Sequence, residues 1–296
     1  MRQRVVLQSI IEQGITSAGT LILSVGLVMA TTPAVFGQFA YIFTMVLIAA
    51  SLQYGLVGLP TLVEIRPLKQ EARQRALQAL IGFDFYYRLF AAALIVFGSF
   101  VLTGEVLVGV VSGGFAYAYL WRETSRNVLF ATELPSVAVK ASVVYLILLV
   151  AIFATLLTTI PSSPLPALIA SAVANFATQW MFAPQRHIEV GAIGVAFTRY
   201  RSRFPLTGWT LGNSIANEAQ TRSYVFVVEV ARGVTALGQL EAARILFAPL
   251  FLAASVWQRA MQPRVAALVA VGRHDGARKL TLLGALANVV LCLLYG

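Results

Sequence analysis

Charged residues and cysteine are both scarce in this chain of 296 residues. Asp, Glu, Lys and Arg make up 11% of it, against about a quarter in an ordinary soluble domain, which argues against a water-soluble globular fold. The single cysteine, Cys292, excludes an intramolecular disulfide and a cysteine-cluster metal site. The sequence contains no HExxH, P-loop or GxSxG motif, so we expect no enzymatic activity, no cofactor and no bound metal.

Long apolar runs take the place of the missing charge. Hydrophobic residues make up 58% of the chain and its mean hydropathy is +0.79. Runs of about 20 apolar residues are long enough to cross a bilayer as helices, which satisfy their own backbone hydrogen bonds in lipid. The sequence therefore predicts an all-α, polytopic bundle of transmembrane helices. We place nine spans near 8–29, 37–59, 82–103, 105–121, 140–160, 164–183, 206–229, 237–259 and 280–295.

The basic residues indicate how these spans are oriented. They collect before the first span and in the even-numbered connections, whereas the odd-numbered connections, such as 30–36 and 160–164, are short and nearly free of them. By the positive-inside rule the basic side is cytoplasmic. We therefore expect a bacterial cytoplasmic membrane protein with its N-terminus inside. The net charge of +10 is then explained by the orientation of the spans in the membrane, and no nucleic-acid partner is expected.

A short pattern occurs twice in the chain. The dipeptide Gly-Gln stands at 37–38 and again at 238–239, each time at the start of an even-numbered span. In both copies a proline follows near the end of that span, Pro60 and Pro263, and a basic connection comes next. This order predicts an internal duplication, because a chance match would not repeat all three features.

Six predicted spans separate the two copies, so the repeating unit has six helices. We expect a six-helix bundle with its connecting loop at 1–203, and the first three helices of a second bundle at 204–296. The second repeat is thus expected to be incomplete within this chain. Tandem repeats of this kind are common in transporters, which bind substrate between the repeats.

These motifs carry a resemblance to a known family. The segments TPAVFGQFAYI, TALGQLEAARI, GLPTLV, MQPRVAAL and YLWRETSRNVLFATELP resemble the flippases of polysaccharide biosynthesis. Those flippases belong to the multidrug/oligosaccharidyl-lipid/polysaccharide exporter superfamily. The resemblance implies two bundles facing a central cavity, alternating access, and a sugar linked to a lipid pyrophosphate as cargo. It also implies polysaccharide polymerases and glycosyltransferases as partners. Typical members have 12 to 14 spans, more than this chain.

Polar residues within the first span are candidates for a cavity wall. Glu12, Thr16 and Thr20 follow one another at steps of four, which predicts a polar strip along one side of the helix. Ionisable groups inside a bilayer usually face a cavity or a partner. Glu12 is then either a site for a coupling H+ or Na+ ion, or an interfacial residue paired with Arg2 or Arg4.

The span at 206–229 is the most polar of the nine. Asn213 and Asn217 lie on one predicted face, and Glu218 and Arg222 lie on the opposite face. A helix that is polar on two faces cannot present either to lipid, so we expect this span inside the bundle, across a cavity from the first span. Glu218 and Arg222 are spaced i, i+4, so they either neutralise each other or contact the substrate.

Arginine suits a pyrophosphate because its planar guanidinium forms paired, charge-assisted hydrogen bonds. The candidates within spans are Arg88, Arg222 and Arg244, each with an acidic residue three or four positions away. Arg122 and Arg126 border the fourth span, and the positive-inside rule explains them more simply than a substrate role does.

The predicted function is a membrane transporter that flips or exports a lipid-linked oligosaccharide or polysaccharide precursor across the cytoplasmic membrane. Two alternatives stay open. One is a cation-coupled multidrug antiporter of the same superfamily, which needs an acidic residue deep in a span. The other is a membrane-embedded sugar polymerase or ligase, which the short odd-numbered connections disfavour.

Overall fold

Every element of the computed structural model is helical. The structure describes residues 2–62, 68–132, 134–160, 162–182, 207–247 and 274–295, together with a few isolated positions between 194 and 201 and at 265. No strand occurs among these described residues. The elements are α1 (Arg2–Ala30), α2 (Pro33–Gln53), the π-helix η1 (Tyr54–Gly58), α3 (Gln70–Thr103), α4 (Val106–Ala131), α5 (Pro135–Thr159), α6 (Leu165–Phe182), α8 (Thr207–Ile245) and α10 (His274–Tyr295).

Several of these helices are built to cross a membrane. Within the described ranges, five are long and apolar enough to do so: Leu7–Ala30, Pro33–Gly58, Gln70–Thr103, Pro135–Thr159 and Leu165–Phe182. This is the pattern of a multi-pass membrane protein. Helices α4, α8 and α10 also lie where spans were predicted, but they are not among the five. The predicted span at 237–259 is described only as far as 247, and Pro263 lies outside the described residues. The count of nine spans and the six-helix repeat therefore stay predictions.

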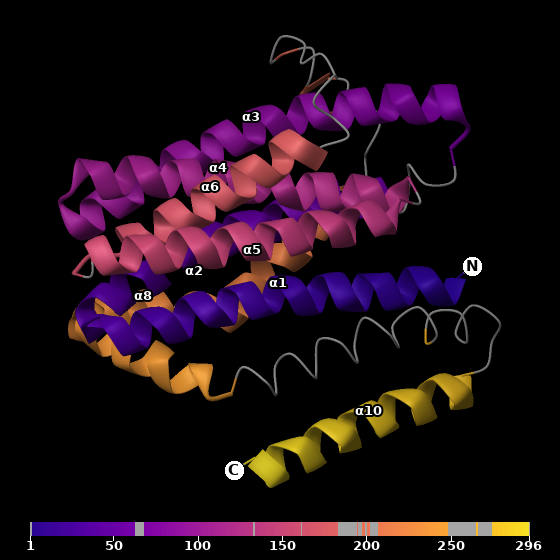
Figure 1. Cartoon of the computed structure of the whole chain (residues 1–296). Helices are drawn as coiled ribbons and strands as arrows, with labels where there is room; N and C mark the ends of the chain where they lie inside the picture. Colours follow the sequence, from indigo (N-terminus) through magenta and orange to yellow (C-terminus); the bar gives the residue numbers. More distant parts are fainter. Residues whose placement is uncertain are drawn as a thin grey trace.

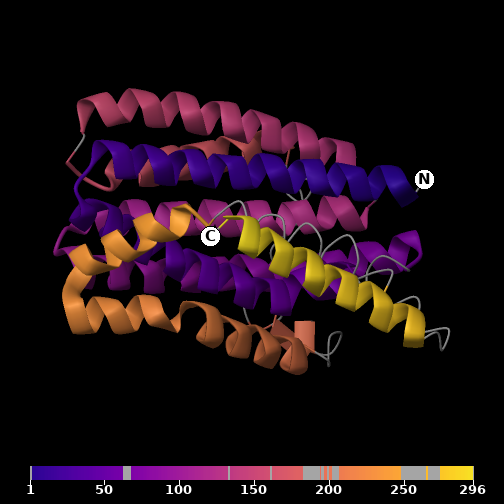
Figure 2. The same ribbon diagram turned by 90° about the horizontal axis from the view of Figure 1, so that it is seen from below.

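Helices α1 to α6 and α8 lie side by side in a bundle, whereas Figure 1 shows α10 set apart from it. Four connections gather at one end of this bundle, at the left of Figures 1 and 2: those between α1 and α2, α3 and α4, and α5 and α6, and the bend within α8. We call this the short-turn end. The N-terminus lies at the opposite end. This is the arrangement that the predicted spans require of their odd-numbered connections.

Local sequence explains how the chain turns at this end. Thr32 caps α2 by accepting a hydrogen bond from the Val35 backbone N–H, and Pro33 opens the helix. Gly104 ends α3 with a left-handed backbone, φ 71°, that favours glycine. The chain also turns within the connection predicted at 230–236, as Figure 2 shows. The helical segment α8 runs from Thr207 to Ile245 and bends at Gly233, where φ is 80°.

Two other predicted spans are longer than expected because amphipathic extensions continue the helix beyond the apolar run. Helix α3 begins at Gln70 rather than at 82, and α4 continues to Ala131 rather than ending near 121. The extension of α4 matters for the site. Arg122 and Arg126 lie inside this helix, where their side chains are 5% and 16% exposed.

The two Gly-Gln motifs meet at the short-turn end, where α2 packs against α8. A Cβ atom added at Gly37 would lie 2.0 Å from the carbonyl oxygen of Val234 and 3.0 Å from the nitrogen of Gly238. A Cβ atom added at Gly238 would lie 1.8 Å from the carbonyl oxygen of Pro33. Only glycine permits this approach of the two backbones. The repeated motif therefore marks a close backbone contact between α2 and α8.

Helix α2 continues into a π-helix at its other end. A π-helix widens the turn and frees carbonyl groups from the regular ladder, often near functional sites. Here Thr210 of α8 donates a hydrogen bond to the carbonyl of Gly55 at 2.6 Å, and the Tyr200 hydroxyl donates to the carbonyl of Leu56. The π-helix thus joins α2 to α8 and to the segment before it.

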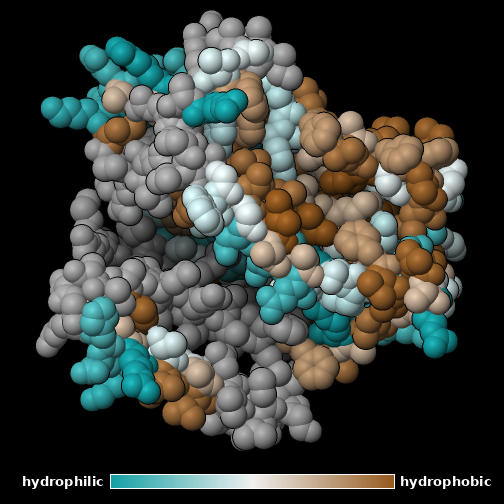
Figure 3. Space-filling view, turned by 180° about the vertical axis from the view of Figure 1, so that it is seen from behind, coloured by the Kyte–Doolittle hydropathy of each residue, from teal (hydrophilic) through white to brown (hydrophobic). Residues whose placement is uncertain are grey.

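The described surface fits a lipid environment. Hydrophobic side chains cover much of the right half of the view in Figure 3. Large apolar residues on α3 and α4, such as Phe97, Val101 and Leu107, are mostly exposed. In a soluble protein such a surface would be an aggregation hazard, whereas in a bilayer it faces the acyl chains.

Candidate functional site

A cavity of about 470 Å³ opens between α1, α2 and α8, and Tyr119 of α4 also lines it. This volume lies within the range of small-molecule sites. Each helix contributes a different kind of side chain. The main lining residues are Gln13, Thr16, Ser17, Thr20 and Ser24 from α1, Phe36, Phe39, Phe43 and Thr44 from α2, and Arg222, Tyr224, Glu241 and Arg244 from α8.

The α1 wall is a ladder of hydroxyl and amide groups, and the α2 wall is aromatic. Thr16, Ser17 and Thr20 present hydroxyls at helical spacing. Phe39 and Phe43 stack with their ring centroids 5.6 Å apart. The cavity is therefore polar on one side and apolar on the other, which suits an amphipathic ligand such as a sugar ring.

The α8 wall carries charge. Glu241 accepts hydrogen bonds from the Tyr224 hydroxyl and from Arg244 Nη1, the latter at 3.0 Å. The Arg244 guanidinium also lies 4.6 Å from the centre of the Tyr224 ring, a cation–π distance. Arg222 Nε donates to Glu218 Oε2 at 2.7 Å. The charged residues of the described lining are two arginines and one glutamate, and the buried Glu218 is not among them.

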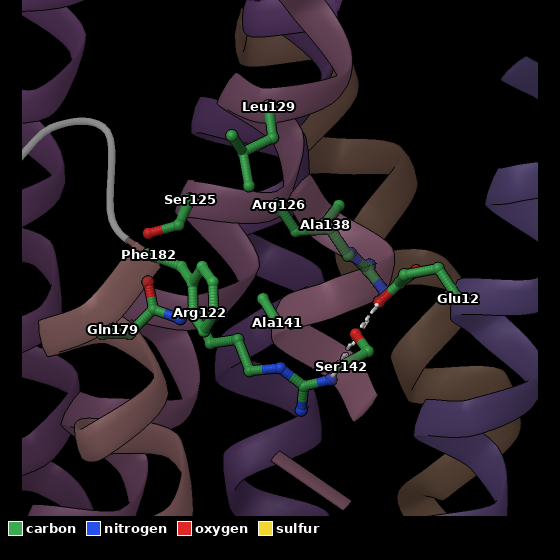
Figure 4. Close-up of a pocket in the computed structure, with 10 residues that line it drawn as sticks. All are labelled: Glu12, Arg122, Ser125, Arg126, Leu129, Ala138, Ala141, Ser142, Gln179 and Phe182. Atoms are coloured by element: carbon green, nitrogen blue, oxygen red, sulfur yellow. Dashed lines mark hydrogen bonds and ion pairs between the residues drawn. The ribbon is translucent and has the colours of Figure 1, made fainter. Parts of the chain in front are cut away.

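Glu12 lies outside this cavity, contrary to the expectation that it would share one face with Thr16 and Thr20. Its side chain is 2% exposed and points toward α4 and α5, as Figure 4 shows. Glu12 Oε1 accepts hydrogen bonds from Ser142 at 2.9 Å and from Thr16 at 3.1 Å. A step of four residues advances about 40° beyond a full turn, so the strip rotates around the helix.

The partners of Glu12 are Arg122 and Arg126, which the sequence analysis explained by the positive-inside rule. Arg126 Nη1 lies 3.6 Å from Glu12 Oε2, and Arg122 Nη2 lies 4.0 Å from Glu12 Oε1. The sequence offered no signal for this pairing, because about 110 residues separate the partners. A small pocket of about 10 Å³, drawn in Figure 4, lies within the cluster and has room for about one water molecule.

Arg88 also lies away from the cavity. It forms a buried ion pair with Asp84 on its own helix, with Arg88 Nε 2.9 Å from Asp84 Oδ2. Gln53 and Thr124 donate to the other carboxylate oxygen at 2.7 and 2.9 Å. The Arg88 guanidinium lies 4.9 Å from the centre of the Tyr117 ring. This pair joins α2, α3 and α4 and presents no charge to the cavity.

The remaining predicted site residues lie on α8. Arg222 and Arg244 line the cavity, whereas Asn213 and Asn217 are exposed and do not. Glu218 is buried and reaches the site only through Arg222. The cavity thus brings together Thr16, Arg222 and Arg244 of the predicted set. Sequence reasoning missed Glu241 and Tyr224 as one cluster, although the i, i+3 spacing of Glu241 and Arg244 hinted at their pairing.

Comparison of the chain with family models, curated proteins and solved structures finds no match. Any function must therefore be argued from the cavity itself. Its paired arginines can bind an anion through charge-assisted hydrogen bonds. Its hydroxyl and aromatic walls can hold a polar ring beside an apolar surface.

Proposed function

We propose that the protein is a membrane transporter that flips an anionic, lipid-linked sugar across the bacterial cytoplasmic membrane by alternating access. The observation that carries this proposal is the cavity between α1, α2 and α8, in which a hydroxyl ladder faces Arg222 and Arg244. A pyrophosphate needs cationic donors and a sugar needs hydrogen-bonding groups. The cavity offers both among helices of a membrane protein.

The charge of the lining favours an anionic cargo over a cationic drug. The described lining holds two cationic side chains, Arg222 and Arg244, and one acidic side chain, Glu241. An incoming anion therefore meets more positive than negative groups. Glu218 and Glu241 act as resting counter-ions, which an incoming pyrophosphate displaces from the two guanidiniums. We propose H+ or Na+ as the ion that could couple to this transport.

Alternating access requires that α2 and α8 separate and close again. The glycine contact at the short-turn end supports this role, because it lets the two backbones touch without interlocking side chains. The cavity lies beside this contact, with Phe36 of α2 lining it. We propose that opening at Gly37 and Gly238 admits or releases the cargo on that side of the membrane.

A flipping assay tests the function directly. The purified protein is reconstituted in liposomes with a polyprenyl diphosphate that carries a fluorescently labelled saccharide, and an impermeant quencher reports probe that reaches the outer leaflet. We expect the native protein to accelerate exchange, and Arg222→Gln with Arg244→Gln to abolish most of the acceleration. Lys at these positions should rescue it only partly, because an ammonium lacks the planar fork.

Arg75→Gln is the matched control, because Arg75 is an α3 arginine whose side chain is 79% exposed and paired at 4.0 Å with Glu71. It should flip the probe at the native rate. The proposal is wrong if the native protein does not accelerate exchange, or if the double variant flips as fast as the native protein.

A further inference from the structure

The hydroxyl ladder of α1 has a second layer behind it that the proposed function does not use. Thr16 faces the cavity, but its hydroxyl is held from the opposite side by two buried side chains. Arg122 Nη2 donates to Thr16 Oγ1 at 2.8 Å. Thr16 Oγ1 in turn donates to Glu12 Oε1 at 3.1 Å. The charged cluster in Figure 4 therefore touches the cavity wall through two residues of α1, Thr16 and Gln13.

These two bonds fix what Thr16 can offer to a ligand. A threonine hydroxyl has one hydrogen and two acceptor sites. Glu12 takes the hydrogen and Arg122 takes one acceptor site. The remaining acceptor site is the hydrogen-bonding capacity left for the cavity. Thr16 is thus held as an acceptor, which matches a ligand group that donates, such as a sugar hydroxyl.

The neighbouring groups are oriented in the same manner. Thr20 Oγ1 donates to the Thr16 backbone carbonyl at 3.4 Å, so its oxygen is also left as an acceptor. Arg126 Nη1 donates to Gln13 Oε1 at 3.4 Å, which turns the amide nitrogen of Gln13 toward Ser17. The two arginines of α4 therefore set the polarity of Thr16 and Gln13 from behind, and the helix backbone sets that of Thr20.

Arg122 is itself held rigidly and cannot reach the cargo. Its side chain is 5% exposed, and its guanidinium lies 3.8 Å from the centre of the Tyr145 ring. It also donates to Ser142 of α5 at 3.3 Å and to Asn175 of α6 at 3.4 Å. These contacts fasten α1 to α4, α5 and α6. Any effect of Arg122 on a cavity ligand must pass through Thr16.

We propose that the α1 face of the cavity is a saccharide subsite centred on Thr16, and that Arg122 is a positioning residue that keeps Thr16 an acceptor for a sugar hydroxyl. The inference rests on the proposed function, since it assumes that the cavity takes a lipid-linked sugar. The charged group of the cargo is bound at the α8 wall, and its sugar lies between the α1 ladder and the aromatic α2 wall.

Two probes separate this inference from the proposed function. One is a polyprenyl diphosphate that carries a single N-acetylhexosamine, and the other is the same lipid without the sugar. The readout is the ratio of their flipping rates, sugar-bearing over sugar-free. Arg244→Gln should slow both probes and leave the ratio near its native value. Thr16→Val should lower the ratio about three- to tenfold, the size of one lost hydrogen bond, and Thr16→Ser should restore it.

Arg122→Lys tests the positioning role. Lysine keeps the charge but lacks the planar guanidinium. We therefore expect Arg122→Lys to lower the ratio of flipping rates when Thr16 is present. It should cause no further fall in a protein that already carries Thr16→Val. Thr155→Val is the matched control, because Thr155 lies exposed on α5 away from the cavity and bonds its own helix backbone. It should leave the ratio unchanged.

The inference is overturned if Thr16→Val slows both probes equally or leaves both unchanged. It is also overturned if Arg122→Lys lowers the ratio by the same factor with and without Thr16, because Arg122 then acts on the fold alone. Should Arg122→Lys fail to fold, the comparison of Thr16→Val with Thr16→Ser decides the subsite by itself. Failure of both probes to flip at all would instead remove the proposed function.

Discussion

The ion pairs of α3 and α8 have the same helical spacing and opposite surroundings. Asp84 and Arg88 on α3 are spaced i, i+4, and their side chains are 0% and 4% exposed. Glu218 and Arg222 on α8 have the same spacing, yet only Glu218 is buried, and the Arg222 side chain is 31% exposed and lines the cavity. Spacing alone therefore predicts that two residues pair, and the neighbouring helices decide whether the pair can be exchanged for a ligand.

The energetic consequence of this difference is large. Removing one member of a buried pair leaves an uncompensated charge and costs about 3–5 kcal/mol. Removing one member of a pair that water can reach costs less, down to about 0–1 kcal/mol for a fully exposed pair. Helix α3 should thus contribute stability, whereas α8 should contribute binding, and mutations on the two helices should separate these effects.

The largest effect on stability is expected for Arg88→Gln. It leaves the Asp84 carboxylate buried with only Gln53 and Thr124 as partners, so the free energy of unfolding should fall by about 3–5 kcal/mol. Denaturation of the purified protein in detergent, followed by circular dichroism, measures this. Arg75→Gln removes an exposed arginine from the same helix and should change it by less than about 1 kcal/mol. Equal losses in both variants would remove the distinction between the two kinds of pair.

The glycine contact should show the next largest effect. Gly37→Ala places a methyl group 2.0 Å from the Val234 carbonyl oxygen, so α2 and α8 must move apart at a cost of about 1–3 kcal/mol. We expect a lower free energy of unfolding and a slower exchange of the probe between leaflets in the flipping assay. Gly114→Ala is the control, since a Cβ atom there meets nothing within 4 Å and alanine favours a helix. A Gly37→Ala protein as stable and active as the control would show that the contact is not needed.

A smaller stability effect than for Arg88→Gln is expected for Arg222→Gln, because the side chains of Arg222 and Glu218 are 31% and 10% exposed whereas those of Arg88 and Asp84 are 4% and 0% exposed. The same change should sharply reduce flipping of the diphosphate probe, because Arg222 lines the cavity. Stability and flipping are measured on one preparation. A loss of stability that matches Arg88→Gln would mean that Arg222 supports the fold rather than the cargo.

The sequence predicted which segments form helices, but it did not predict where several of those helices begin and end. Apolar runs located the five membrane-length helices. The charged starts and ends of α3 and α4 were missed because they are amphipathic extensions that continue the helix past the apolar part. The turn predicted at 231–236 lies where α8 bends, but the sequence did not show that a single left-handed glycine, Gly233, redirects the chain with helix continuing on both sides.

The candidate site was predictable only where it depended on a single helix. Thr16, Arg222 and Arg244 were identified from their positions within spans, and all three line the cavity. The partners of Glu12 could not be found, because Arg122 and Arg126 fit the positive-inside rule equally well as loop residues. Their burial depends on how α1 packs against α4 and α5, which periodicity within one helix does not encode.

The most direct test of the account is the affinity of the purified protein for a short-chain polyprenyl diphosphate, measured by isothermal titration calorimetry. Arg244 is held by Glu241 in the resting cavity, so Glu241→Gln should release its guanidinium and tighten binding, whereas Arg244→Gln should weaken it. The account predicts this order of affinities, with the native protein between the two variants. Equal affinities in all three proteins, or weaker binding in Glu241→Gln than in the native protein, would contradict an anion site at the α8 wall.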